Sequence, residues 1–341
     1  MDAQGTVIAD WLLATRRVLA HGAAERLSTA SASVIAALTN DLDNLAAALA
    51  VGRDELFDDH VAWSLAAGAS DDVDEPRCAA RLAALRDELE VSVPGTARTR
   101  VAAVLTRGID MARRPAIRQP PSFPPAGPHQ ELAARYLLAI LEARTQDAHD
   151  LLLRALHDGA DGPSLLHHVL LPAQAELGRM WQCGEIDIAT EHLGSRVAER
   201  IAAVIHAQGP RSASNGRRVM VAAVGGNQHD LASRLLADAL ERRGYVALLL
   251  GADTPPIDLA EAAAHARVDA VALSVALGTQ VRIAELTVRA LRSLRETAHV
   301  KVIVGGGPFT RIDDLWRDIG ADASAPDLDG AVAAIEALLS S

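Results

Sequence analysis

Aromatic residues are scarce in this chain of 341 residues, where Trp, Tyr and Phe together make up 3% of the sequence. A core with so few rings has to be packed from Ala, Leu and Val, and Ala- and Leu-rich segments favour helices because these side chains lose little freedom there. The two cysteines, Cys78 and Cys183, are too few and too far apart for a disulfide framework or a zinc site. We therefore expect a helix-rich protein of a reducing compartment, the cytoplasm.

Positive charge is also in short supply, with 33 Lys and Arg against 44 Asp and Glu. The net charge of -11 argues against a protein that grips nucleic acid through its phosphates, because that needs a basic face. No apolar run approaches the ~20 residues that span a bilayer, and no signal peptide is recognised. We expect no direct nucleic-acid contact, no membrane insertion and, at this length, two or three domains.

The hydrophobic pattern divides the chain into four segments. Residues 1–114 show apolar positions at three- and four-residue spacing and no strand-like alternation, which predicts an all-helical domain, either a bundle or a globin-like stack. Residues 115–128 carry six prolines and read as a linker. Residues 129–208 read as a block of four helices, and residues 217–341 alternate between strand and helix patterns.

The C-terminal segment has the pattern of a doubly wound α/β domain. Its strand candidates are short, continuous and rich in Val, Leu and Ile, as in a parallel sheet buried on both faces. Strand and helix alternate at the spacing of a flavodoxin-like fold, which binds its ligand at the carboxyl ends of the strands. We expect strands at 219–225, 246–252, 270–277, 300–307 and 322–325 and helices near 230–243, 257–266, 281–296 and 309–319. A final helix after the last strand is expected to end at Leu339.

His229 lies directly after the first expected strand, in the turn GGNQHDLA of residues 225–232. A neutral imidazole at this edge is a good ligand for cobalt and other first-row metals, although the ring can equally cap a helix or contact a phosphate. Small residues at other strand ends, Ser274, Gly305 and Gly306, would open a deep slot between the sheet and its helices. No G-x-G-x-x-G follows the first strand, so the fingerprint of a dinucleotide site is missing.

A second motif lies upstream, in the helical block. Trp181 is followed, after nine intervening residues, by the pair Glu191 and His192. At this spacing one helical face can present all three side chains to a ligand. The alternative is that Trp181 belongs to the core and that Glu191 and His192 are a solvated pair.

The C-terminal pattern resembles the B12-binding fold of methionine synthase, corrinoid methyltransferase components and adenosylcobalamin-dependent mutases. In that family a D-x-H-x-x-G turn supplies a histidine to cobalt, so the resemblance implies that His229 is the lower axial ligand. Asn227 and Ala232 stand where the family has Asp and Gly, and an asparagine can still accept the imidazole N–H but lacks the charge that raises its basicity. The resemblance implies further cofactor contacts at Asn227, Asp230, Leu231, Ala232, Ala252, Asp253, Thr254, Ser274, Gly305 and Gly306.

The helical block resembles the cap of the B12-dependent photoreceptors, which carry the same W-x9-E-H pattern. The resemblance implies that Trp181, Glu191 and His192 cover the upper face of adenosylcobalamin and its adenosyl group. Light-regulated transcription factors of this group have a histidine directly after the tryptophan, which ligates cobalt after light, whereas this chain has Gln182. Water, His192 or one of the pair His167 and His168 would have to take that place.

The N-terminal segment offers a possible second chromophore site. His60 is followed by Arg77 and Arg81, and a histidine with nearby arginines suits a tetrapyrrole whose propionates the arginines clamp. The alternative is an ordinary histidine beside solvated arginines. A helical N-terminal domain ahead of a B12 module is similar to the photocobilins, which implies biliverdin there, with Cys78 either an attachment point or a buried thiol.

These patterns predict a light sensor that uses adenosylcobalamin, with biliverdin as second chromophore, and not an enzyme. No helix-turn-helix is recognised in residues 1–114, so we expect the signal to be a change in conformation or oligomeric state, in a homodimer or light-dependent oligomer, read by an unknown downstream protein. Two alternatives stay open. One is a corrinoid methyl-carrier protein of a methyltransferase system, and the other is a B12-binding regulatory module without photochemistry.

Overall fold

The computed structural model describes residues 3–29, 31–67, 78–114, 123, 127–182, 184–209 and 212–340. Arg77 and Cys183 therefore lie outside the described residues. The chain forms two compact units. The larger unit takes in the N-terminal helices and the C-terminal α/β region, and the smaller unit takes in the helices between them.

Among the described residues, five helices form the N-terminal part of the larger unit, which confirms the all-helical prediction. Helix α1 packs against α2 and α4, and α4 packs against α5. By length and composition α2 could cross a membrane, but 56% of its apolar stretch is buried inside the protein. The five helices are α1 (Ala3–Arg26), α2 (Ala32–Val51), α3 (Glu55–Ala67), α4 (Cys78–Ser92) and α5 (Gly95–Ala112).

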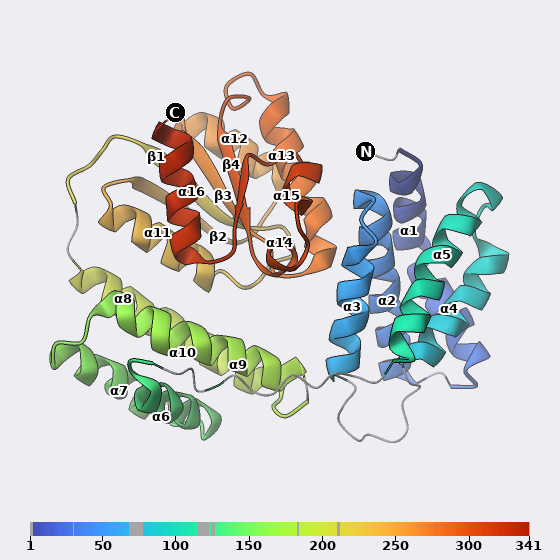
Figure 1. Cartoon of the computed structure of the whole chain (residues 1–341), viewed down its shortest axis with the longest axis horizontal. Helices are drawn as coiled ribbons and strands as arrows, with labels where there is room; N and C mark the ends of the chain where they lie inside the picture. The colour runs from blue at the N-terminus through green and yellow to red at the C-terminus, as the bar shows by residue number, and fades with distance from the viewer. Residues whose placement is uncertain are drawn as a thin grey trace. The chain divides into compact units, whose positions relative to one another are not determined.

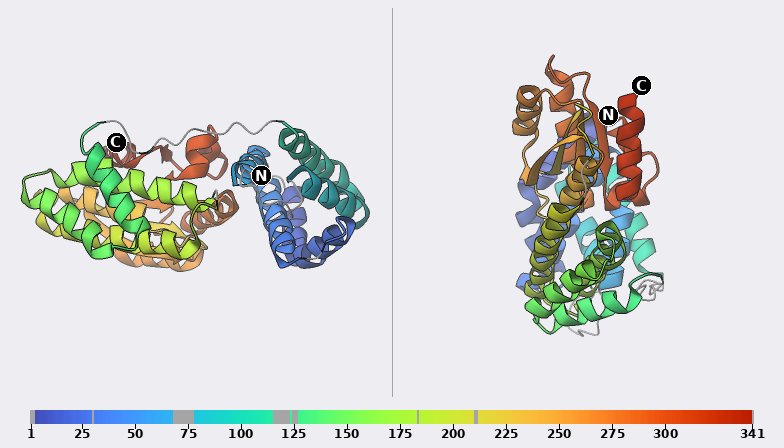
Figure 2. Two further views of the ribbon diagram at one scale, coloured as in Figure 1. Left: turned by 90° about the horizontal axis from the view of Figure 1, so that it is seen from below. Right: turned by 90° about the vertical axis from the view of Figure 1, so that its left-hand side faces the viewer.

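The described part of the smaller unit contains the four expected helical segments, and the third of them, residues 162–182, begins irregularly. A π-helical turn joins α8 to α9 without a break in the helix. Helices α9 and α10 run side by side (Figure 2) and approach closely at Gly194, where an added Cβ would lie 2.4 Å from Leu177 Cδ1. The elements are α6 (Gln130–Leu141), α7 (Thr145–His157), α8 (Gly162–Leu165), η1 (Leu166–Leu170), α9 (Leu171–Gln182) and α10 (Ile188–Gln208).

The C-terminal part of the larger unit is a parallel five-stranded sheet with strand order β2-β1-β3-β4-β5. This is the order of a flavodoxin-like doubly wound fold, as predicted, and its ligand crevice lies where the order reverses, between β1 and β3. Helices α11 and α16 cover one face of the sheet, and α12 and α13 cover the other (Figure 1). The elements are β1 (Arg218–Val224), α11 (Leu231–Arg242), β2 (Val246–Thr254), α12 (Pro256–Ala266), β3 (Ala270–Ser274), η2 (Gly278–Gln280), α13 (Val281–Ser293), β4 (Lys301–Gly305), β5 (Ala323–Ala325) and α16 (Leu328–Ser340).

Strand β1 shows why these strands read as continuous apolar runs. Val219 and Val221 pack into the core on the α11 and α16 side, whereas Met220 and Ala222 pack into the core that includes α12 and α13. Both faces are covered, so alternate residues are equally buried. The second of these cores continues into the N-terminal helices, which makes the larger unit one packed body.

The single helix predicted over 309–319 was wrong. The structure has two short helices there, α14 (Gly307–Arg311) and α15 (Leu315–Asp318). Between them Ile312 is extended, with φ -120° and ψ 110°, and Asp314 is left-handed, with φ 58°. An aspartate tolerates the left-handed conformation better than most residues, so the chain can turn at this point although the apolar spacing continues.

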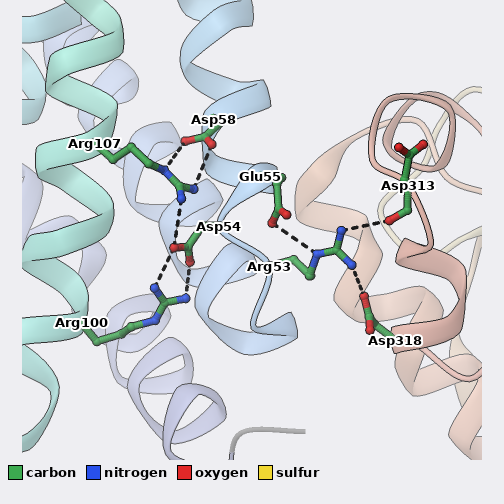
Figure 3. Close-up of polar contacts among 8 residues, drawn as sticks. All are labelled: Arg53, Asp54, Glu55, Asp58, Arg100, Arg107, Asp313 and Asp318. Atoms are coloured by element: carbon green, nitrogen blue, oxygen red, sulfur yellow. Dashed lines mark hydrogen bonds and ion pairs between the residues drawn. The ribbon is translucent and has the colours of Figure 1, made fainter.

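Charged contacts join the N-terminal helices to the α/β region of the same unit. Arg53, which follows α2, pairs with the Asp318 carboxylate and donates to the Asp313 carbonyl at 3.0 Å (Figure 3). Arg311 makes two hydrogen bonds to the Asp59 carboxylate on α3, at 2.6 and 2.8 Å. Helix α2 also packs against η2 and α13. The helical part therefore contacts the segments that follow β3 and β4, near the expected ligand edge.

Candidate functional site

The carboxyl ends of four strands meet at one edge of the sheet, as the sequence predicted. In the strand register Val224 of β1 lies opposite Thr254 of β2, and Ser274 of β3 lies opposite Gly305 of β4. The turn that holds His229 follows β1 directly. The structure thus brings the predicted α/β site residues to the same edge, at the point where strand order reverses.

His229 is exposed at this edge, and its ring makes no hydrogen bond or ion pair to another described residue. Its backbone N–H donates to Asn227 Oδ1 at 3.1 Å. Asn227 is fully buried and donates from Nδ2 to the Ser274 carbonyl at 3.1 Å. The expected bond from the imidazole to Asn227 is therefore not made: the amide instead ties the turn to β3 and leaves the His229 ring accessible.

Asp253, at the end of β2, secures the same turn from the other side. Its Oδ1 accepts the backbone N–H of Gly226 at 2.7 Å, and its own N–H donates to the Asn227 carbonyl at 3.0 Å. Both Gly226, with φ 79°, and Asp253, with φ 52°, are left-handed. The turn before His229 is thus held by the Asp253 side chain of β2 on one side and by the bond from its own Asn227 to the Ser274 carbonyl of β3 on the other.

The remaining predicted contacts of the turn and of β2 lie around these two anchors. Asp230 precedes α11 and pairs with Arg234 at 3.4 Å, so its carboxylate faces along its own helix. Ala232 is exposed on the first turn of α11. Leu231, Ala252 and Thr254 are half-buried.

The two glycines predicted to line the slot have different roles. A Cβ on Gly306 would lie 2.0 Å from the Val275 carbonyl oxygen, and its φ of 113° also requires glycine. A Cβ on Gly305 would lie 3.4 Å from the Ala325 carbonyl oxygen, a tight but ordinary contact. The fold itself therefore demands Gly306, whether or not a ligand lies beside it.

Gln280 is a site residue that the sequence did not reveal. It is buried in η2, donates from Nε2 to the Gly226 carbonyl at 3.0 Å, and accepts from the backbone N–H groups of Ala276 and Leu277. It thereby bridges the β1 turn to the segment after β3. Gly278, two residues earlier, faces Leu56 and Asn44 of the N-terminal helices.

In the smaller unit, the pair Glu191 and His192 lies near the start of α10, with Glu191 in its first turn. Glu191 is buried, and its Oε1 lies 2.9 Å from Ser195 Oγ, while its Oε2 lies 3.6 Å from His192 Nε2. The His192 side chain is 63% exposed, and Trp181, near the end of α9, is 42% exposed. A tryptophan exposed to this degree is not a core residue, so that alternative does not hold for Trp181.

The turn between α9 and α10 is held by charge. Arg179 binds Glu176 and Glu185, and these hydrogen bonds raise the pKa of its guanidinium. Asp187 caps α10 by accepting the Thr190 N–H at 2.7 Å, which lowers the pKa of that carboxylate. The side chain of Gln182 lies outside the described atoms.

His167 and His168 both lie in the π-helical turn η1, with ring centroids 4.9 Å apart in an edge-on arrangement. Single π-helical turns inside α-helices are frequent at functional sites. That His167 or His168 ligates cobalt in place of the histidine that is Gln182 in this chain stays a prediction.

In the N-terminal helices, two of the three residues predicted to bind a bilin, His60 and Arg81, form an ionic cluster with Asp41, and the third, Arg77, lies outside the described residues. His60 is buried with Nε2 2.7 Å from Asp41 Oδ1, and Arg81 Nε donates to Asp41 Oδ2 at 3.2 Å. Asp41 lies on the buried face of α2, a seven-residue step from Val34, and a carboxylate at that position was the signal for it in the sequence. Burial, with a smaller contribution from Asp41, raises the pKa of the Cys78 thiol to about 11.

A corrinoid fits the chemistry at the sheet edge. An accessible imidazole without a protein partner can place a nitrogen lone pair on a metal, and the turn that carries it is fixed by Asn227, Asp253 and Gln280. Among the described residues no group of three or more His, Cys, Asp and Glu side chains could hold a metal ion. His229 is thus a candidate as a single protein ligand.

Two family models match the chain, both described as B12 binding domains. One covers residues 217–336, the sheet and its helices, and the other covers residues 132–205, the cap helices. The chain therefore carries two segments that match B12 binding domains, together called the B12 module below. The structure of the Methanosarcina barkeri monomethylamine corrinoid protein has a similar fold, with a TM-score of 0.53 and 22% identity over 61% of this chain and 99% of that one.

The module is homologous to that of the B12-dependent photoreceptor repressors CarA and CarH, which confirms the resemblance. The HTH-type transcriptional repressor CarA of Myxococcus xanthus is 35% identical over 40% of this chain and 45% of its own length. Dimethylamine corrinoid protein 3 of Methanosarcina acetivorans is 31% identical over 34% of this chain and 54% of its own. The chain thus spans about half the length of the curated relatives it matches.

Proposed function

We propose that this protein senses light through adenosylcobalamin. The observation that carries the proposal is the accessible, unpartnered imidazole of His229 at the switch point of a B12-binding domain. Homology to the CarA and CarH repressors, and the W-x9-E-H tract that includes Trp181, favour photochemistry over methyl transfer.

The chain's own residues would divide the work as follows. His229 would hold the metal through a ring nitrogen, while the Asn227 and Asp253 contacts hold the turn in place. Ser274 and Gly305 would border the nucleotide tail, and Trp181 and Glu191 would contact the adenosyl group. Adenosylcobalamin, when bound, supplies a weak cobalt–carbon bond that visible light breaks.

A signal has a physical route from this edge to the N-terminal helices. Gln280 joins the Gly226 carbonyl of the β1 turn to η2, and η2 packs against α2. Arg311, five residues after Gly306, holds Asp59 of α3. A shift of either segment on ligand loss changes contacts of α2 and α3, and we propose that this alters a homodimer or larger oligomer read by a cytoplasmic partner.

Biliverdin as a second chromophore is the finer part of the proposal. His60 Nε2 and Arg81 Nε already engage Asp41, so a bilin bound here would have to use other atoms of these groups or displace the carboxylate. Adding biliverdin to the purified protein tests this directly, because a red-region absorption band that survives gel filtration reports binding. Absence of that band would contradict the proposal that biliverdin binds, without affecting the proposal that the protein senses light through cobalamin.

A corrinoid methyl carrier is the second candidate, because several dimethylamine corrinoid proteins match the same module. To separate the two, adenosylcobalamin and methylcobalamin are each added in the dark, and spectra and elution volume are recorded before and after green light. A sensor retains the adenosyl form and changes both spectrum and elution volume with light. Preference for the methyl form and a response to a methyl donor would identify a carrier, and binding with no response to either would leave a regulatory module.

A further inference from the structure

Three polar side chains on α9 and α10 form a chain that ends at Glu191. Ser195 Oγ lies 3.0 Å from Gln174 Oε1 and 2.9 Å from Glu191 Oε1. Glu191 is buried, and the other two are half-buried. The close approach of the helices at Gly194 brings Gln174 of α9 to Ser195 of α10.

In this arrangement the hydrogen-bonded series Gln174–Ser195–Glu191 lacks one hydrogen. A serine hydroxyl has a single hydrogen, yet both neighbours of Ser195 present acceptor oxygens, and a carboxylate can only accept. At the same time Gln174 Nε2 is buried with no hydrogen-bond partner. Gln174 therefore has an unused N–H donor, while the Ser195 hydroxyl next to it faces two acceptor oxygens with a single hydrogen.

A half-turn of the Gln174 amide supplies the missing donor to Ser195. Amide oxygen and nitrogen are told apart by their hydrogen-bond network, so the network decides the orientation. With Nε2 toward Ser195, Gln174 donates to the hydroxyl and the hydroxyl donates to Glu191 Oε1. The amide oxygen then takes the place beside Gly194 that Nε2 otherwise occupies, 3.6 Å from the position of an added Cβ.

We propose that Gln174 and Ser195 are positioning residues that hold Glu191 for the adenosyl group of the ligand. The donor chain occupies Oε1 and fixes the carboxylate, so that Oε2, whose neighbour is His192 Nε2 at 3.6 Å, is the oxygen that can accept a hydroxyl. An adenosyl group carries two ribose hydroxyls and a methyl group carries none. The series of hydrogen bonds from Gln174 through Ser195 to Glu191, called the relay below, therefore sets a preference for adenosylcobalamin over methylcobalamin. In this respect it rests on the proposed function.

The binding test uses the full-length protein with Ser195→Ala and Gln174→Glu. Both variants break the relay, the first by removing the hydroxyl and the second by replacing the donor with an acceptor of the same shape. We expect the Kd for adenosylcobalamin to rise roughly tenfold, as for a lost hydrogen bond to a charged group, and the Kd for methylcobalamin to stay the same. Ser195→Thr, which keeps the hydroxyl, should restore wild-type binding.

Arg196→Ala is the matched control, because Arg196 is next to Ser195 but pairs outward with Glu199. Wild-type adenosylcobalamin affinity in both Ser195→Ala and Gln174→Glu would overturn the proposal. Equal weakening of both cobalamin forms would also overturn it, because the relay would then support the cap in general and not the adenosyl side.

A second measurement needs no cofactor. In the ligand-free protein the melting-temperature losses of Ser195→Ala and Gln174→Met should not add in the double variant, because both changes break one chain. Additive losses would show that the two side chains are not linked. If the wild-type protein fails to bind adenosylcobalamin at all, the proposed function fails, while this coupling still decides whether the relay exists.

Discussion

Two histidines of the larger unit, His60 and His229, differ in what surrounds their rings. His60 is buried on α3 with Nε2 2.7 Å from Asp41, and Arg81 binds the other oxygen of the same carboxylate. His229 stands exposed beyond β1, and the described protein around it binds its backbone but not its ring. A buried carboxylate paired on both oxygens cannot lose a partner without a cost in stability, whereas an exposed ring on a braced turn is free to bind a ligand.

The largest expected effect comes from opening the buried cluster. Asp41→Ala leaves His60 and Arg81 without their shared acceptor, and breaking a buried ion pair in this way costs about 3–5 kcal/mol of unfolding free energy. Urea unfolding followed by circular dichroism measures the loss. A loss below about 1 kcal/mol would show that the cluster is not a stabilising core and would weaken the contrast with His229.

Asp43→Asn is the matched control on the same helix. Burial raises the pKa of the Asp43 carboxyl, and Arg16 only partly opposes this. A raised pKa means that the group favours the folded state at low pH and that this contribution is lost as the pH rises through its folded value. At pH 7 the charge-removing substitution should therefore cause no loss of stability.

The thiol beside the cluster gives the next largest effect. With its pKa raised to about 11 by burial, Cys78 should react about a hundredfold more slowly with iodoacetamide at pH 8 than a free cysteine. The rate should climb with each step of pH toward 11, because the thiolate is the reactive form. A Cys183→Ser background isolates Cys78, and a fast reaction at neutral pH would show instead an accessible thiol suited to covalent attachment.

Replacing the exposed histidine should act on the ligand and spare the fold. His229→Ala should weaken cobalamin binding by about ten- to a hundredfold, since it removes a metal ligand. The melting temperature should stay almost unchanged, because the residue is exposed and its ring makes no hydrogen bond or ion pair to another described residue. Equilibrium dialysis and calorimetry give the two numbers. His265→Ala, an exposed histidine of the same domain, should change neither, and unchanged affinity in His229→Ala would refute cobalt ligation.

The smallest effect lies at the contact between the helical part and the α/β region. The Arg311 and Asp59 side chains are 50% and 23% exposed, so their pairing should contribute only about 0.2–1 kcal/mol in a double-mutant cycle. If this contact relays the state of the ligand edge, the coupling energy should differ between ligand-free and cobalamin-bound protein. An identical value in both would remove Arg311 from the route.

The sequence was sufficient for features that depend on local pattern. Continuous Val and Ala runs predicted β1 to within one residue, and the residues after each strand were correctly placed at one sheet edge because parallel strands end together. It failed at 309–319, where apolar spacing continues across a left-handed Asp314. Periodicity does not encode a single backbone angle.

The partners of the site residues depended on tertiary structure and were not predictable. Gln280 reaches the Gly226 carbonyl across 54 positions of sequence, and Asn227 turned out to serve Ser274 and not the ring of His229. A buried partner for Asp41 could have been predicted, because an acidic residue on the buried face of α2 needs one. Only the packed structure shows that the partners are His60 and Arg81.

The most direct measurement is the electron paramagnetic resonance spectrum of the protein loaded with cob(II)alamin, prepared once with ordinary and once with ¹⁵N-labelled histidine. The unpaired electron of cobalt is split by the nucleus of its axial nitrogen, and the two nitrogen isotopes have different nuclear spins. If His229 ligates cobalt, the splitting changes from triplets to doublets on labelling, and the doublets are lost in His229→Ala. Triplets that persist in the labelled protein would show that the cofactor keeps its own base on cobalt and that His229 does not bind the metal.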